Sequence, residues 1–274
     1  MGDSNVIHTF VVLAYKESEY LEECIKSVIN QKYKSNVVVA TTTDNKFIRN
    51  IAKKYKIDVV VGEHTNIGGD FDFAKNVGKT KLVTIAHQDD LYDYEYSYKV
   101  VEEYKKNIRV SIIFSDYYEI RNGDKEYSNT NLRIKRILLF PLRLRVLGKF
   151  KFFRRWVLRF GNSICCPAVT FVKKNTPKEV FNCDLTCNID WYAWEKLSKN
   201  KYSFIYIKNK LMGHRISVES TTTDIINSGV RTKEDNYIFK KFWPKFIANI
   251  LTKLYRNSEK SNEIWYNLFI IFFC

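Results

Sequence analysis

The residues best suited to chemistry are an imidazole and two adjacent carboxylates at the end of a short apolar run. Residues 82–86 have the β-rich, apolar composition of a buried strand, and His87, Asp89 and Asp90 lie just beyond it. In open α/β sheets ligands bind outside the carboxyl ends of the strands, and carboxylates there can hold a divalent cation against a phosphate. The alternative is that Asp89 and Asp90 only cap a helix that begins near Tyr94.

A further carboxylate and a polar loop follow much later in the chain. Asp190 and Trp191 lie in the predicted first turn of a helix, where the helix dipole stabilises a carboxylate that could reach an active cleft or simply cap the helix. His214 and Arg215 are expected in a loop that continues into the hydroxyl-rich residues 219–223.

The elements that must position these groups alternate between strand and helix. Alternation of this kind predicts a mostly parallel sheet with helices on both faces. The apolar segments predict strands at residues 6–14, 37–40, 57–61, 82–86, 110–115 and 203–207. The fifth strand is expected to end at Asp116, and a long helix is expected over residues 231–255.

Polar residues also follow other strands of this predicted sheet. Thr42 and Asp44 come after the second strand and are suited to hydrogen bonding a ligand at the same edge. Beyond the third strand, the pair Gly68 and Gly69 permits close backbone approach, and Asp70 is expected to cap the next helix.

Composition bounds the class of partner. The chain has 274 residues and a formal charge of +15, which favours an anionic partner. Ten Lys and Arg residues and no acid lie in residues 132–160, interleaved with large apolar side chains. This pattern favours an anionic lipid surface, at about 1 kcal/mol for each basic residue, over a nucleotide phosphate or a solvated helix pair. It contains no base-stacking motif, so nucleic acid is not expected as a partner.

The sequence also predicts a cellular location. Residues 1–5 are polar rather than the start of a secretory signal, and the apolar segment 264–274 is shorter than the roughly 20 residues that span a bilayer. The six cysteines lack zinc-site spacing and are expected to be free thiols in a reducing compartment. We therefore expect a cytoplasmic protein, peripheral on the cytoplasmic face of the membrane.

In their order and spacing, these motifs resemble the inverting family 2 glycosyltransferases of GT-A fold, bacterial enzymes that build capsule, lipopolysaccharide or other surface glycans. The resemblance rests on residues 14–17, 21–31, 69–78, 87–90, 190–191 and 214–215. It implies a Rossmann-like GT-A sheet with a basic helical C-terminal part. Residues 1–120 would bind the nucleotide sugar, residues 121–225, which include the basic segment 132–160, would bind the acceptor, and residues 226–274 would form a helical extension.

The resemblance also implies roles for individual residues. Asp89, Asp90 and His214 would hold Mn²⁺ or Mg²⁺ against the departing diphosphate, and Asp190 would be the general base that deprotonates the acceptor. The residues implied in binding the nucleotide sugar are Ala14, Tyr15, Glu17, Thr42, Asp44, Gly69, Asp70, His87, Gln88 and Arg215.

Two departures from the family pattern bear on these roles. The family usually has Asp where His87 stands, and the acid pair that commonly reads uracil is here Thr42 and Thr43. The expected function is transfer of a hexosyl group, with inversion, from a nucleotide-diphosphate donor of the UDP type to a glycan or lipid-linked saccharide in surface polysaccharide biosynthesis. The alternative, motivated by His87, is a catalytically degenerate module that only binds nucleotide or membrane.

Overall fold

The structure, a computed structural model, describes residues 6–216 and 229–260. Its centre is a nine-stranded sheet of order β3-β2-β1-β4-β8-β6-β9-β5, with β7 paired to β6. The strands are β1 His8–Ala14, β2 Asn36–Thr41, β3 Asp58–Val61, β4 Leu82–His87, β5 Leu91–Tyr92, β6 Val110–Arg121, β7 Asp124–Glu126, β8 Val169–Val172 and β9 Ser203–Ile216. The α-helices are α1 Leu21–Ile29, α2 Lys46–Lys54, α3 Ile67–Val77, α4 Tyr96–Lys106, α5 Thr130–Leu138, α6 Lys151–Trp156, α7 Ile189–Ser198, α9 Val230–Phe239 and α10 Lys245–Lys260.

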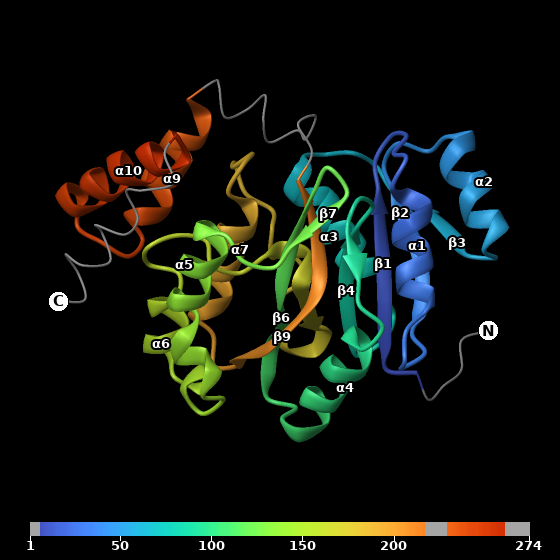
Figure 1. Cartoon of the computed structure of the whole chain (residues 1–274), viewed down its shortest axis with the longest axis horizontal. Helices are drawn as coiled ribbons and strands as arrows, with labels where there is room; N and C mark the ends of the chain where they lie inside the picture. Colours follow the sequence, from blue (N-terminus) through green and yellow to red (C-terminus); the bar gives the residue numbers. More distant parts are fainter. Residues whose placement is uncertain (1–5, 217–228, 261–274) are drawn as a thin grey trace.

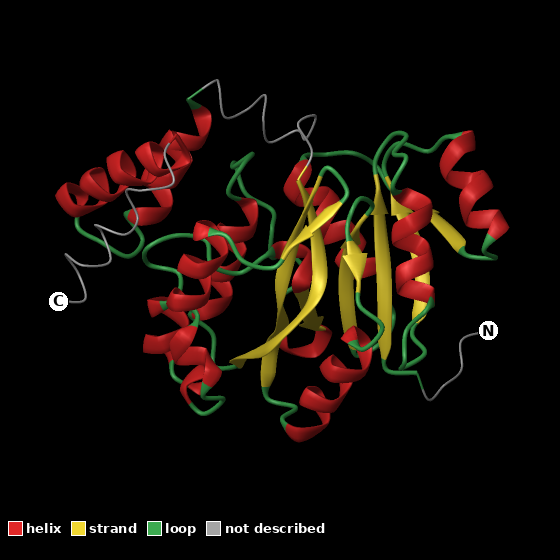
Figure 2. Cartoon of the chain, viewed as in Figure 1, coloured by secondary structure: helices red, strands yellow, loops and turns green. Residues whose placement is uncertain are grey.

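The first four strands of the chain form the parallel part of the sheet. β1 pairs in parallel with β2 and β4, and β2 pairs in parallel with β3. Helices join these strands and flank the sheet (Figure 2). The predicted α/β fold with a mostly parallel sheet is therefore confirmed, and the carboxyl ends of β1, β2 and β4 meet at one edge.

Two apolar cores, one on each face of the sheet, explain why the strands read as continuous apolar runs. Successive residues of β1 point into different cores. Phe10 packs with Leu21 of α1 on one face, whereas Val11 packs with Ala74 of α3 on the other. Burial of both faces requires apolar residues at every strand position, which is typical of parallel sheets. The helices therefore lie on both faces, as expected.

The second half of the sheet differs from the prediction. β8 lies antiparallel between β4 and β6, and β6 pairs in parallel with β9 along their lengths. The predicted end of a strand at Asp116 is wrong, because β6 continues to Arg121. The buried Asp116 carboxylate is compensated by an ion pair with Arg136 at 2.7 Å, so a charged residue can lie within the strand.

The same pairing corrects the prediction for His214 and Arg215. The strand expected at residues 203–207 extends to Ile216 as β9, so both residues lie on a strand rather than in a loop. Glu119 pairs with His214 and Ile120 with Arg215 across the β6–β9 ladder. The loop predicted at the hydroxyl-rich residues 219–223 falls outside the described residues.

Two predicted helix starts are also corrected. Asp89 and Asp90 do not cap a helix at Tyr94, because β5 intervenes and α4 begins at Tyr96. The cap of α3 is Asn66, whose side chain accepts a hydrogen bond from the Gly69 amide, and Asp70 lies in the first turn instead.

The basic segment and the C-terminal part are helical, as expected. Residues 132–160 run through α5, two short 3₁₀ turns and α6. The helix expected over residues 231–255 is divided into α9 and α10 just before and after Pro244, which lacks an amide hydrogen. Figure 1 shows these two helices at the opposite end of the molecule from α2 and β3. No helix among the described residues is both long enough and apolar enough to cross a membrane, and the apolar segment 264–274 lies outside them.

Candidate active site

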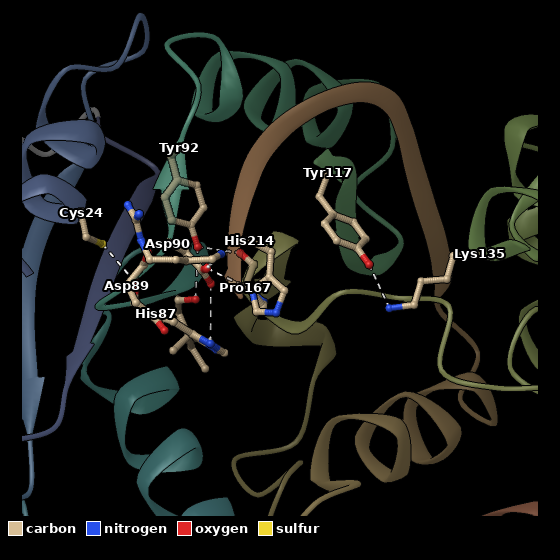
Figure 3. A network of polar contacts seen from close by, with 11 residues as sticks. Cys24, His87, Asp89, Asp90, Tyr92, Tyr117, Lys135, Pro167 and His214 are labelled. Atoms are coloured by element: carbon tan, nitrogen blue, oxygen red, sulfur yellow. Dashed lines mark hydrogen bonds and ion pairs between the residues drawn. The ribbon is translucent and has the colours of Figure 1, made fainter. Parts of the chain in front are cut away.

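Three potential metal ligands meet where β4 leaves the core. One ligand atom each from His87, Asp89 and Asp90 lies within 4.8 Å of the others. Asp90 is fully buried, and its Oδ2 has no hydrogen-bond partner, as is also true of His87 Nε2. Figure 3 shows the three side chains close together, below Tyr92 in that view. His87 Nδ1 lies 3.8 Å from Asp90 Oδ2, too far for a hydrogen bond, so a bound cation would offset the cost of burying this carboxylate.

β9 brings a second set of polar groups to the same place. His214 Nδ1 lies 3.0 Å from Asp90 Oδ1, and the Arg215 amide donates to that same oxygen at 2.9 Å. The Arg215 guanidinium donates to the Asp89 carbonyl at 2.9 Å and to Glu23 at 2.7 Å, and it stacks over the Tyr20 ring. The strand–strand pairing therefore fixes the orientation of Asp90 and of the Asp89 backbone.

Burial and charge determine the protonation of this cluster. Burial, together with the neighbouring charge of Asp90, raises the pKa of Asp89. Burial lowers the pKa of His87 against the attraction of Asp90 and Asp89, so its imidazole is neutral and can act as a ligand. Burial works against charge on His214, but Asp90 raises the pKa of that imidazole.

The donor set fits a divalent cation. Two carboxylates and one neutral imidazole, with an unpartnered Oδ2 on Asp90 and an unpartnered Nε2 on His87, suit an ion such as Mn²⁺ or Mg²⁺. His87, expected to bind nucleotide, belongs to this group. His214 is not part of this group of potential ligands, since its Nδ1 atom contacts Asp90 Oδ1 instead. Its expected role as a metal ligand stays a prediction.

Asp190 is held by two hydrogen bonds at the start of α7. Asn162 donates to its Oδ2 at 2.6 Å, and the Trp191 amide donates to its Oδ1 at 2.7 Å. Trp191 is fully buried, and its indole donates to the Leu158 carbonyl, which fixes the first turn of the helix. Burial raises the pKa of Asp190 despite these hydrogen bonds. A carboxylate with a raised pKa is a better proton acceptor, as a general base requires.

The charges of Asp90 and Asp190 act on the same pair of thiols. Burial is the main cause of the raised pKa of Cys165 and Cys166, and the negative charges of both Asp90 and Asp190 add to it. Pro167, the next residue, accepts a hydrogen bond of 2.6 Å from Tyr92, close to Asp90 in Figure 3. The two carboxylates that the sequence singled out are thus brought within electrostatic reach of one segment.

The predicted nucleotide-binding residues at the ends of β1 and β4 contact one another. The Gln88 carboxamide accepts from the Tyr15 amide at 3.0 Å and donates to the Tyr15 carbonyl at 2.9 Å. This double hydrogen bond fixes the backbone beyond β1, where Ala14 is buried and the Tyr15 and Glu17 side chains are exposed. Their roles in binding nucleotide stay predictions.

The residues at the ends of β2 and β3 form a second cluster. Thr42 donates to Asp70 Oδ2 at 3.1 Å, and His64 Nδ1 lies 2.8 Å from the same oxygen. Asp70 Oδ1 is buried and has no partner. Asp44 instead pairs with Arg49 at 2.7 Å. The structure therefore brings Thr42 and Asp70 together, whereas the Asp44 carboxylate contacts a surface arginine.

Gly69 lies in the first turn of α3, next to this cluster. A Cβ atom at Gly69 would lie 2.0 Å from the Thr65 hydroxyl oxygen, and one at Gly68 would lie 2.3 Å from the Phe181 carbonyl oxygen, so the close backbone approach predicted for the glycine pair is present at Gly68.

Sequence reasoning missed three residues of the site. For His64 the only indication in the sequence is that it precedes the glycine pair, and nothing in the sequence indicates a role for Asn162. Lys135 was counted only in the basic segment, yet its ammonium donates to the Tyr117 hydroxyl at 2.9 Å, as Figure 3 shows. Its positive charge lowers the pKa of Asp190, His214 and Cys165, so Lys135 contributes to the electrostatics of both groups of carboxylates.

Comparison with known proteins places this geometry in context. The model of the family described as glycosyl transferase family 2 matches residues 9–174, which include the cluster at the end of β4 but not Asp190 or His214. No curated protein matches the sequence.

Solved structures share the fold at low sequence identity. The S. aureus TarS structure is 14% identical with a TM-score of 0.54, and the match covers 89% of this chain but 42% of TarS. TarS 1–349 in complex with UDP-GlcNAc is 13% identical with a TM-score of 0.58, covering 89% and 70% of the two chains. The mannosyltransferase PcManGT from Pyrobaculum calidifontis, in complex with GDP-Man and Mn²⁺, is 14% identical with a TM-score of 0.56, covering 90% and 69%.

Proposed function

Because the chain belongs to glycosyl transferase family 2, we propose that it transfers a hexosyl group, with inversion, from a nucleotide-diphosphate donor to a saccharide acceptor. The observation that carries this proposal is the pairing of two features. The cluster of His87, Asp89 and the buried Asp90 has two buried ligand atoms without hydrogen-bond partners. Asp190 is held by Asn162 and the Trp191 amide, and its charge acts on the same Cys165–Cys166 segment as that of Asp90.

The proposed reaction is a single displacement. The acceptor hydroxyl oxygen attacks C1 of the donor sugar as the bond from C1 to the diphosphate oxygen breaks, and the configuration at C1 inverts. The hydroxyl proton passes to the Asp190 carboxylate, which Asn162 and the Trp191 amide hold in place. A divalent cation bound by His87, Asp89 and Asp90 would supply Lewis-acid stabilisation of the leaving diphosphate. Asp90 is held ready by His214 and the Arg215 amide.

We propose a donor of the UDP type. The residues that would contact it are those at the ends of β1 and β2, where Tyr15 is fixed by Gln88 and Thr42 by Asp70. TarS 1–349 binds UDP-GlcNAc and PcManGT binds GDP-Man, so similar folds accept either base. The unpartnered Asp70 Oδ1 is an acceptor for a base or ribose donor group.

We further propose that the acceptor is lipid-linked and lies at the cytoplasmic face of a membrane, in surface polysaccharide synthesis. Exposed basic and apolar side chains alternate along residues 143–146 and again along residues 149–152. Phe140 and Leu144 are each 63% exposed, and Phe152 is 61% exposed. Apolar side chains among basic ones complement an anionic phospholipid surface, which accepts both.

The charges of this segment are not all available to such a surface. Arg154 is buried and donates to four backbone carbonyls, and Arg136 pairs with Asp116. We therefore limit the proposed membrane surface to residues 140–152. The basic segment 132–160 as a whole thus combines a membrane surface with residues that hold the fold.

A donor screen tests the catalytic proposal. The full chain with Mn²⁺ is incubated with UDP-GlcNAc, other UDP-hexoses and GDP-mannose, and release of the nucleotide diphosphate is measured with and without bacterial membranes as the source of acceptor. Release from one UDP-sugar, accelerated by membranes, is the expected result. No release from any of these donors, together with nucleotide binding in a thermal-shift assay, would favour a module that only binds nucleotide.

Vesicle sedimentation tests the membrane surface separately. The wild-type chain should sediment with phosphatidylglycerol vesicles and much less with phosphatidylcholine vesicles, and F140S/L144S should lose this binding. Ile108 is 53% exposed but lies outside the surface, so I108S is the matched control and should bind like wild type. Equal binding by F140S/L144S and I108S would refute this surface.

A further inference from the structure

A buried carboxylate from the C-terminal part holds the backbone that leads into the Asp190 helix. Glu234 of α9 accepts hydrogen bonds from the amides of Thr186, Cys187 and Asn188 at 2.7, 2.8 and 2.9 Å. The neighbouring Asp235 accepts from the Asn188 side chain at 2.8 Å. Glu234 is only 6% exposed, so these are charge-assisted hydrogen bonds in a place from which water is largely excluded.

These contacts hold the chain just before α7, whose N-cap side chain makes no capping hydrogen bond. The first amides of a helix lack partners within it, and a side chain at the N-cap normally satisfies one of them. Asn188 occupies that position but makes no capping hydrogen bond, because its side chain turns to Asp235. The path of the chain into α7 is therefore set by a later helix, through contacts between residues 46 positions apart, Asn188 and Glu234.

The same helices pack against the next turn of α7. The Trp191 ring, fully buried, makes an edge contact with Phe239 of α9 at a centroid distance of 5.1 Å and lies 6.0 Å from the Tyr255 ring of α10. Asp190 lies between these two fixed points, the Glu234 contacts on one side and the Trp191 contacts on the other. Its own hydrogen bonds then orient the carboxylate within that frame.

We propose that α9 positions the general base, and that Glu234 is the residue through which it acts. The inference rests on the proposed function of Asp190. A carboxylate is required because its two oxygens accept three amides together, as the distances above show. In glutamine the amide group would present N–H to at least one of these N–H donors, so the segment would move.

The test compares E234Q with a matched variant on the same helix. Asn236 donates to Asn249 and Thr252 of α10 but makes no contact with residues 186–188 in the described hydrogen bonds, so N236A weakens the helix pair without touching the clamp. Hydrogen exchange of the peptide covering residues 186–191 should be about tenfold faster in E234Q, as the loss of a hydrogen bond to a charged group implies, and unchanged in N236A.

Kinetics distinguishes positioning of the base from general loosening of the fold. With the donor that the screen identifies, E234Q should lower kcat by about 10²-fold, as expected for a misplaced catalytic group, while KM for the donor stays as in wild type. In a D190N background, where no base remains to be positioned, E234Q should lower kcat no further. N236A should retain wild-type kcat.

Each outcome decides the proposal. Equal loss of kcat for E234Q in the wild-type and D190N backgrounds, or unchanged exchange at residues 186–191, would show that Glu234 does not act through Asp190. A D190N variant as active as wild type would instead refute the proposed function, and the exchange measurement would still report whether the clamp exists.

Discussion

Replacing Asp190 by Asn removes the proposed general base with little change in shape. The Trp191 amide can still donate to the Oδ1 atom of the new side chain. Asn162 now donates to Oδ2 at 2.6 Å, and its own Oδ1 is buried without a partner. Rotation of the Asn162 amide by half a turn would present that oxygen to the new NH₂ group, so the local hydrogen bonds can re-form.

The D190N variant should lose catalytic activity but keep or gain stability. Loss of general base catalysis should lower kcat by ~10²–10⁴-fold, which corresponds to about 3–5 kcal/mol in the activation free energy. Burial raises the pKa of Asp190, so at neutral pH the folded protein pays for a charged carboxylate that Asn does not carry. The free energy of unfolding of D190N at pH 7 should therefore be at least that of wild type.

The assay measures both quantities on the same preparation. Nucleotide release gives kcat, thermal melting gives stability, and D184N, a change at an exposed acid nearby, serves as control and should match wild type in both. In wild type, kcat should fall as the pH is lowered, because the base must be deprotonated to accept a proton. The midpoint of this fall should lie above pH 3.8, the ordinary pKa of Asp, because the pKa of Asp190 is raised. A well-folded D190N with the wild-type kcat, or a large loss of stability that accounts for its inactivity, would refute the reasoning.

Three further predictions concern the metal, a buried histidine and the packing of α3. EDTA should abolish transfer and Mn²⁺ should restore it, whereas D89N should stay inactive at any Mn²⁺ concentration; full activity in EDTA would contradict the metal site. Burial lowers the pKa of His8 from 6.5 to about 3, so between these values the unfolded chain binds a proton that the folded chain does not. As the pH falls through this window the free energy of unfolding should drop by about 1.4 kcal/mol per unit, and chemical denaturation of H8Q should lack this component. A Cβ at Gly68 would lie 2.3 Å from the Phe181 carbonyl oxygen, so G68A should lower the free energy of unfolding by about 1–3 kcal/mol, and an unchanged melting temperature would disprove this contact.

The parallel part of the fold could be predicted because its central strands, β1 and β4, are buried on both faces. Residues 82–86 and their counterparts in β1 and β2 are apolar at nearly every position, so their strands stand out from the sequence. The continuation of β6 beyond Asp116 could not be predicted in this way, because it contains Glu119, a charged residue that is unusual in a buried strand. Its burial is explained only by Arg121 and Asn129, which bind it at 2.8 Å in the folded chain.

The site was predictable where chemistry and local structure coincide. Asp89 and Asp90 follow a clear strand, and Asp190 begins a clear helix, so their residue types and places suffice. Glu234 and Asn162 could not be predicted, since their roles depend on contacts with residues 46–48 and 28 positions away in the chain. Such pairings are determined by tertiary packing, which neither periodicity nor composition encodes.

The most direct test of the central claim is crystallographic. Crystals of the full chain with Mn²⁺ and UDP should give an anomalous difference peak among the side-chain ligand atoms of His87, Asp89 and Asp90, with the UDP diphosphate beside it and the Asp190 carboxylate facing the diphosphate. A manganese peak elsewhere with this cluster empty, or a diphosphate on a face of the protein that Asp190 does not reach, would contradict the account.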